Sequence, residues 1–311
     1  MSRIYKHDFS IFTITRKVYW KENKNVVKYI QAKENGGECM LKNAKIIAVD
    51  FITTFMNKKV MRSAAALSYY LMLTFFPFLI CFNWIIGLFD IDFAKIAQAV
   101  NGIIPASAFE IMETYMDYVY SNQSKALLIA GAVMFMTGLS AAFRLIVTTL
   151  EDINGVKRIK GLKFYLWGII SSTVFMFGTY IFLMIAMFSG LIIDFIKKYI
   201  GIDLRIFEAL PYVLLFAYLF IVLTVLYKKS HPKGYPIARV WKGALAGSLG
   251  TILISIIFSR FIEFSARYSL VYGSLSSVIL LMVWIFFCSN VIICGNILNH
   301  GIEIIRERRG R

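Results

Sequence analysis

The chain has 311 residues, of which 59% are hydrophobic and only 17% are charged, and its mean hydropathy is +0.67. Water cannot be the solvent for most of such a surface, so these values exclude an ordinary soluble domain. The formal net charge of +16 would indicate nucleic acid in a soluble protein, but membrane proteins also retain Lys and Arg in their cytoplasmic loops. We therefore expect membrane lipids as partners, and not nucleic acid.

The chain begins with a polar, lysine-rich arm over residues 1–43, which lacks the apolar run of a cleavable signal peptide. After the arm, apolar residues recur at helical spacing: Ala44, Ile47, Ala48, Phe51, Ile52 and Phe55. Such a stripe predicts an amphipathic helix over 44–62 that lies at the cytoplasmic interface.

Six apolar runs follow, and most of them are about 20 residues long, the length that crosses a ~30 Å hydrocarbon core. They predict membrane spans at 64–88, 126–149, 164–193, 207–227, 243–259 and 274–298. The predicted fold is therefore all-α, a polytopic membrane domain over residues 63–300 followed by a basic tail over 301–311. The fifth run is near the short limit for a span, and the third is long enough to tilt.

The distribution of Lys and Arg predicts the orientation of these spans. With the N-terminus inside, 26 of the 34 basic residues fall on the inner side and seven on the outer side, and Arg144 lies within a span. Basic residues are retained in cytoplasmic loops during insertion, so both termini are predicted to be cytoplasmic.

Arg144 is the most informative single residue, because a cation inside a span costs from ~3 kcal/mol upward and by default indicates a functional site. It lies five residues before the predicted end of the second span, about 8 Å at helical rise, so its side chain can reach the interface. Glu151 follows seven residues later on the same helical face as a candidate ion-pair partner. An orienting ion pair and a ligand-binding role both fit Arg144.

A second candidate site lies at the outer ends of the fifth and sixth predicted spans. It combines charged and aromatic side chains within a short stretch: Arg260, Glu263, Arg267, Tyr268 and Tyr272. Interfacial anchoring is one role for such a cluster, and recognition of an anionic headgroup or solute by its arginines is the other.

Several residues indicate how the spans pack. Pro77 lies inside the first span, where its missing N–H predicts a kink. Gly243 and Gly247 form a Gly-x-x-x-Gly pattern in the fifth span, which fits close packing within the chain, a contact between two copies in a homo-oligomer or a substrate path. We interpret the amides of Asn290, Asn296 and Asn299 as packing contacts of the last span.

Enzymatic chemistry finds little support in the sequence. The three histidines and four cysteines show no metal-ligand spacing, so no metal or other cofactor is expected. No Gly-x-Ser-x-Gly elbow and no Walker loop is present, so neither serine hydrolysis nor an ATPase is predicted. We therefore do not expect an enzyme.

From about residue 45 to 300, the chain resembles the YihY/BrkB family of bacterial inner-membrane proteins. The resemblance rests on these stretches: Ala64–Tyr70 with Pro77, Ser140–Arg144, Leu150–Asn154, Trp241–Ala244, Tyr272–Leu275, Trp284 and Gly295–Asn299. Many relatives read Gly-Ala-Glu-Leu-Asn in the last stretch, where this chain has Ile297 in place of the acidic residue. The resemblance implies six spans, a cytoplasmic N-terminus and a location in the bacterial inner membrane.

The family resemblance implies less about activity. Relatives have carried the label ribonuclease BN and a virulence-factor label, and a related branch has been connected with lipid export. The leading hypothesis is a membrane protein that transports or flips a lipid or another amphiphilic anion. The alternatives are a structural or envelope-assembly protein and, least favoured, a ribonuclease.

Overall fold

The computed structural model describes residues 39–88, 124–156, 161–200, 210–232, 234–264 and 275–309. Within these ranges the chain is helical and contains no strand, which confirms the predicted all-α class. The elements are α3 (Cys39–Asn57), α4 (Val60–Leu88), α7 (Lys125–Asn154), α8 (Leu162–Ile200), α9 (Leu210–Lys229), the 3₁₀ turn η2 (Ile237–Arg239), α10 (Trp241–Phe264) and α12 (Leu275–Arg309). Most of the arm and the loop over 89–123 lie outside the described residues.

Each of the six predicted spans falls on one of these helices. Among the described residues, five segments are long and apolar enough to cross a membrane: Val60–Phe82, Lys125–Asn154, Leu162–Ile185, Trp241–Phe261 and Ser276–Glu307. The remaining predicted span, 207–227, coincides with α9, which packs against α8 and α10.

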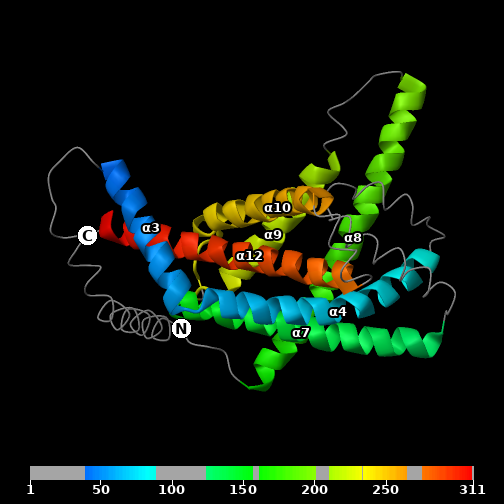
Figure 1. Cartoon of the computed structure of the whole chain (residues 1–311), viewed down its shortest axis with the longest axis horizontal. Coiled ribbons are helices and arrows are strands. Elements are labelled where there is room, and N and C mark those ends of the chain that lie inside the picture. The colour runs from blue at the N-terminus through cyan, green and yellow to red at the C-terminus, as the bar shows by residue number, and fades with distance from the viewer. Residues whose placement is uncertain are drawn as a thin grey trace.

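The helices form one bundle around a shared core. Figure 1 shows α4, α7 and α12 running side by side, with α10 along α12 and with α8 crossing the others at a steep angle. The buried residues of this core come from α4, α7, α9, α10 and α12, and they include Val60, Leu150, Tyr227, Ala244 and Ile293. They gather where α4 begins and α7 ends. We call this end of the bundle the basic end. It also includes the α3–α4 junction, the end of α9 and the starts of α8 and α10.

The break between α3 and α4 lies earlier than the sequence predicts. The predicted interfacial helix runs to residue 62, but α3 ends at Asn57 and α4 begins at Val60. Lys59 lies between them in the left-handed region, with φ of 51°. Its backbone N–H donates to the carbonyl of Met56 at 3.2 Å, a tighter turn than that of an α-helix. This turn ends α3 and sets a new direction for α4.

The second span extends further than predicted. Its helix α7 continues to Asn154 and ends at Gly155, whose φ of 66° and N–H bond to the carbonyl of Glu151 form a left-handed C-cap. Arg144 is therefore ten residues from the end of α7, roughly 15 Å at helical rise, instead of the five residues expected.

Two further helices depart from simple straight spans. Pro77 is buried inside α4, and Figure 1 shows α4 changing direction in the half that carries this proline. The last helix, α12, runs without interruption from Leu275 to Arg309, so most of the predicted basic tail is helical. α3 packs across this extension, where Asp50 Oδ2 lies 3.2 Å from His300 Nδ1 and both side chains are buried.

Candidate functional site

Arg144 is held on the face of α7 that packs against α8. Its guanidinium donates a hydrogen bond to the hydroxyl of Ser140, one turn earlier on the same helix. The guanidinium carbon lies 4.7 Å from the ring centroid of Tyr165, within the first turn of α8. Gly168 provides the space, since a Cβ there would lie 2.9 Å from Arg144 Cγ. The cation is therefore positioned by a hydroxyl and an aromatic face.

This environment leaves most of the binding capacity of Arg144 unused. A guanidinium has five N–H donors in a planar fork, and Ser140 accepts one hydrogen bond. The side chain is only partly buried, so part of it stays accessible from outside the bundle. Such a fork matches the paired oxygens of a phosphate or carboxylate. The arrangement can hold an anionic group at the depth of the first turn of α8.

Glu151 is more deeply buried than Arg144. The two residues are seven positions apart on α7, about 10 Å at helical rise, and the described contacts of Arg144 go to Ser140 and Tyr165. Glu151 is 2% exposed, between the core residues Leu150 and Ile153. The ion pair between these two residues stays a prediction.

The structure describes only part of the outer cluster. Arg260 is exposed on α10, and Glu263 belongs to the last turn of the same helix, which ends at Phe264. Arg267, Tyr268 and Tyr272 lie outside the described residues. The cluster remains a prediction.

A buried amide pair joins the end of α7 to α12. Asn154 and Asn296 exchange hydrogen bonds, with Nδ2 to Oδ1 distances of 3.4 and 3.2 Å. Asn154 also donates to the hydroxyl of Ser230, which follows α9, at 3.0 Å, and Ser230 donates to the carbonyl of Tyr227 at 2.8 Å. Sequence analysis missed Asn154 and Ser230, because nothing local distinguishes them from ordinary helix-end residues. The network ties three helices together at the basic end.

Close packing of α9, α10 and α12 involves both predicted glycines. A Cβ at Gly243 would lie 2.1 Å from the carbonyl oxygen of Gly295, and a Cβ at Gly247 would lie 2.8 Å from the hydroxyl of Tyr227. Asn299 accepts a hydrogen bond from the N–H of Gly243 at 2.7 Å and donates to the carbonyl of Val240 at 2.9 Å. The Gly-x-x-x-Gly pattern therefore lies inside the bundle, with the amide of Asn299 binding the first turn of α10.

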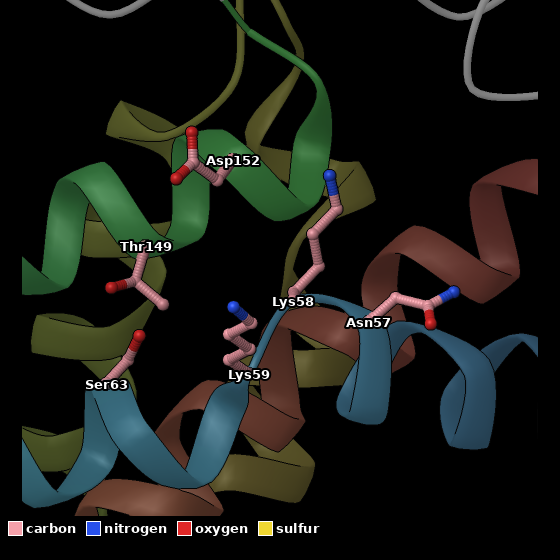
Figure 2. Close-up of a pocket in the computed structure, with 6 residues that line it drawn as sticks. All are labelled: Asn57, Lys58, Lys59, Ser63, Thr149 and Asp152. Atoms are coloured by element: carbon pink, nitrogen blue, oxygen red, sulfur yellow. The ribbon is translucent and has the colours of Figure 1, made fainter.

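A polar pocket lies beside the α3–α4 junction. It has a volume of about 200 Å³ and is lined by Asn57, Lys58, Lys59, Ser63, Thr149 and Asp152. Figure 2 shows the lysines on the junction, Ser63 on the first turn of α4, and Thr149 and Asp152 on the last turns of α7. None of these six residues was predicted as a site residue, because their sequence positions match the polar face of the predicted interfacial helix and the ends of predicted spans.

These features define the class of protein. An all-α bundle with five apolar helices of membrane-crossing length, each with a stretch that carries few charged residues, is an α-helical membrane protein. A family model described as "Virulence factor BrkB" matches residues 51–311. The chain therefore belongs to the BrkB family, as its resemblance to YihY/BrkB proteins predicted.

One curated relative is similar over most of both chains. The "Putative ribonuclease-like protein YfkH" of Bacillus subtilis (strain 168) is 25% identical over 240 residues, which is 76% of this chain and 87% of that protein. No solved structure matches the chain. Ile297, the position at which the family resemblance led us to expect an acidic residue, is fully buried in the core cluster and makes apolar contacts there.

Proposed function

We propose that this membrane protein binds a lipid or another amphiphilic anion through Arg144 and moves it across the bilayer. The observation that carries the proposal is a guanidinium inside a membrane-crossing helix whose described contacts are a hydroxyl and an aromatic ring. A charge in that position is costly in hydrocarbon unless it meets a counter-charge, water or headgroup oxygens. An anionic group that approaches along α8 supplies the missing counter-charge.

The proposal includes six spans in a bacterial inner membrane. α9 is 20 residues long, about 30 Å at helical rise, which is enough to cross the hydrocarbon core. With α9 as a span, the chain crosses an even number of times, and both termini lie on one side. The basic end then faces the cytoplasm, where Lys228 and Lys229 at the end of α9 contact anionic headgroups.

The transport test uses the full chain in liposomes that contain a fluorescent anionic phospholipid. Flipping is measured as the fraction of label that an impermeant reductant quenches, with and without a proton gradient. Arg144→Gln is expected to slow flipping at least tenfold, and Arg144→Lys to keep part of the rate, because a point charge replaces the fork. Arg306→Gln is the matched control, since Arg306 is exposed at the far end of α12 and should leave the rate unchanged. Wild-type protein that moves neither lipid nor an anionic solute would contradict the proposal.

A structural or envelope-assembly role is the second candidate, and the buried Asn154–Asn296 pair favours it, since such bonds hold helices together without any ligand. Under this alternative, Arg144→Gln changes the unfolding temperature but no flux. The name of the Bacillus relative also makes RNA cleavage a testable activity. Cleavage by purified protein that disappears on replacing an acidic residue of the basic end would favour that function.

A further inference from the structure

We propose that the pocket beside the α3–α4 junction is a second anion site, separate from Arg144, which recognises a phosphate group. The pocket of about 200 Å³ holds the volume of roughly six waters and is smaller than the pockets that enclose drug-sized ligands. It therefore accommodates a headgroup-sized anion and not a whole lipid. All six lining residues are polar or charged, so nothing in the pocket favours an apolar ligand.

Charge and hydrogen-bonding capacity favour an anion. Two lysines and one carboxylate, Asp152, line the pocket, which leaves a net positive charge. In Figure 2 the amine of Lys59 points into the space between the α4 and α7 residues, and the hydroxyl of Ser63 faces the same space. The hydroxyl of Thr149 donates to the carbonyl of Leu145 at 2.9 Å, so we assign the amine of Lys59 and the hydroxyl of Ser63 as the donors to a ligand.

The backbone conformation of Lys59 is energetically unfavourable for lysine but not for glycine. Within the described residues, Lys59 is the one non-glycine residue with positive φ, at 51°. Glycine adopts this conformation freely, and the position after a helix is where it is most favoured. A lysine here directs its amine toward the pocket, while its carbonyl accepts hydrogen bonds from the N–H groups of Arg62 at 2.9 Å and Ser63 at 3.2 Å in the first turn of α4.

The surroundings of the pocket match a ligand that carries an apolar part. Met56 on α3 and Met61 on α4 flank the two lysines in sequence and are 71% and 57% exposed. A phospholipid headgroup in the pocket would have its apolar portion beside these side chains. A free phosphate would use the same donors but would make no contact with the two methionines. The chemical group shared by both ligands is therefore the phosphate.

The test measures binding of a short-chain phosphatidic acid to the purified full chain in neutral detergent. Lys59→Gly removes the amine and relaxes the backbone, so the unfolding temperature should stay equal or rise. Its apparent Kd should rise roughly fivefold, the effect of one lysine on an interfacial anion. Lys45→Gln is the matched control, because Lys45 is exposed on α3 and does not line the pocket, and its Kd should not change. Asp152→Asn should act in the opposite direction and tighten binding.

Competition with inorganic phosphate distinguishes the two ligands. If millimolar phosphate displaces the lipid, the site recognises the phosphate group alone. If millimolar phosphate does not displace the lipid, the site recognises the lipid headgroup. Equal affinity of the wild type and Lys59→Gly would overturn the inference. Lipid binding could also be abolished by Arg144→Gln and left intact by Lys59→Gly. That result would overturn the inference about the pocket and would support the proposed function. Loss of the Lys59-dependent binding has no bearing on flipping through Arg144, so the two proposals fail separately.

Discussion

The crossing of α10 and α12 allows a quantitative prediction for Gly243→Ala. The new Cβ would lie 2.1 Å from the carbonyl oxygen of Gly295, against the 3.3–3.6 Å of close carbon–oxygen contacts, so the two backbones must separate by roughly 1 Å. The same shift lengthens the hydrogen bond from the Gly243 N–H to Asn299, now 2.7 Å. Overpacking costs about 1–3 kcal/mol, and a weakened buried hydrogen bond costs about 1 kcal/mol more.

We therefore expect Gly243→Ala to lower the free energy of unfolding by about 2–4 kcal/mol. The assay is unfolding in detergent, monitored by the reaction of the buried Cys288 with a thiol dye. Gly178→Ala is the matched control, because its Cβ would meet Tyr218 at 3.7 Å, an ordinary contact, and alanine favours the helix. Equal stability of the two variants would refute the close approach of α10 and α12.

Three further predictions concern other contacts. Alanine at Asn154 and at Asn296 should give a double-mutant coupling of about 0.5–2 kcal/mol in the same unfolding assay, and strictly additive effects would contradict the reciprocal amide bonds. Asp50→Ala leaves its buried histidine partner without the carboxylate, so α3 should become more sensitive to limited proteolysis, while unchanged cleavage would mean that α3 is held elsewhere. Gly168→Ala should displace Arg144 from its ring contact without removing its charge, and flipping in liposomes should slow, whereas an unchanged rate would separate that position from function.

The helices could be predicted from the sequence because apolar runs of span length are a local property. The end of α7 was also readable, since Asn154-Gly155 is a common helix stop, but the charges at Glu151 and Asp152 ended the apolar run and placed the predicted boundary at 149. The break at Lys59 was not readable, because lysine carries no preference for positive φ.

The candidate sites depended on contacts between distant residues. Ser140 lies one turn from Arg144 and was within reach of sequence reasoning, but Tyr165 follows a loop and belongs to another helix. Asn154 and Asn296 are 142 positions apart, and a single sequence does not show that two such distant residues are in contact. The pocket at the α3–α4 junction required both the unpredicted turn and the longer α7.

The uninterrupted helix α12 is long enough that a small tilt displaces its ends by several ångströms. At 35 residues it is roughly 50 Å long, so a tilt of about 5° at one end displaces the other by roughly 4 Å. Asp50 and His300 join α3 to the C-terminal part of α12, one residue after Asn299, whose amide binds the start of α10. A shift of this end of α12 would therefore move α3 as well, and the last residue of α3, Asn57, lines the pocket together with Lys58 and Lys59.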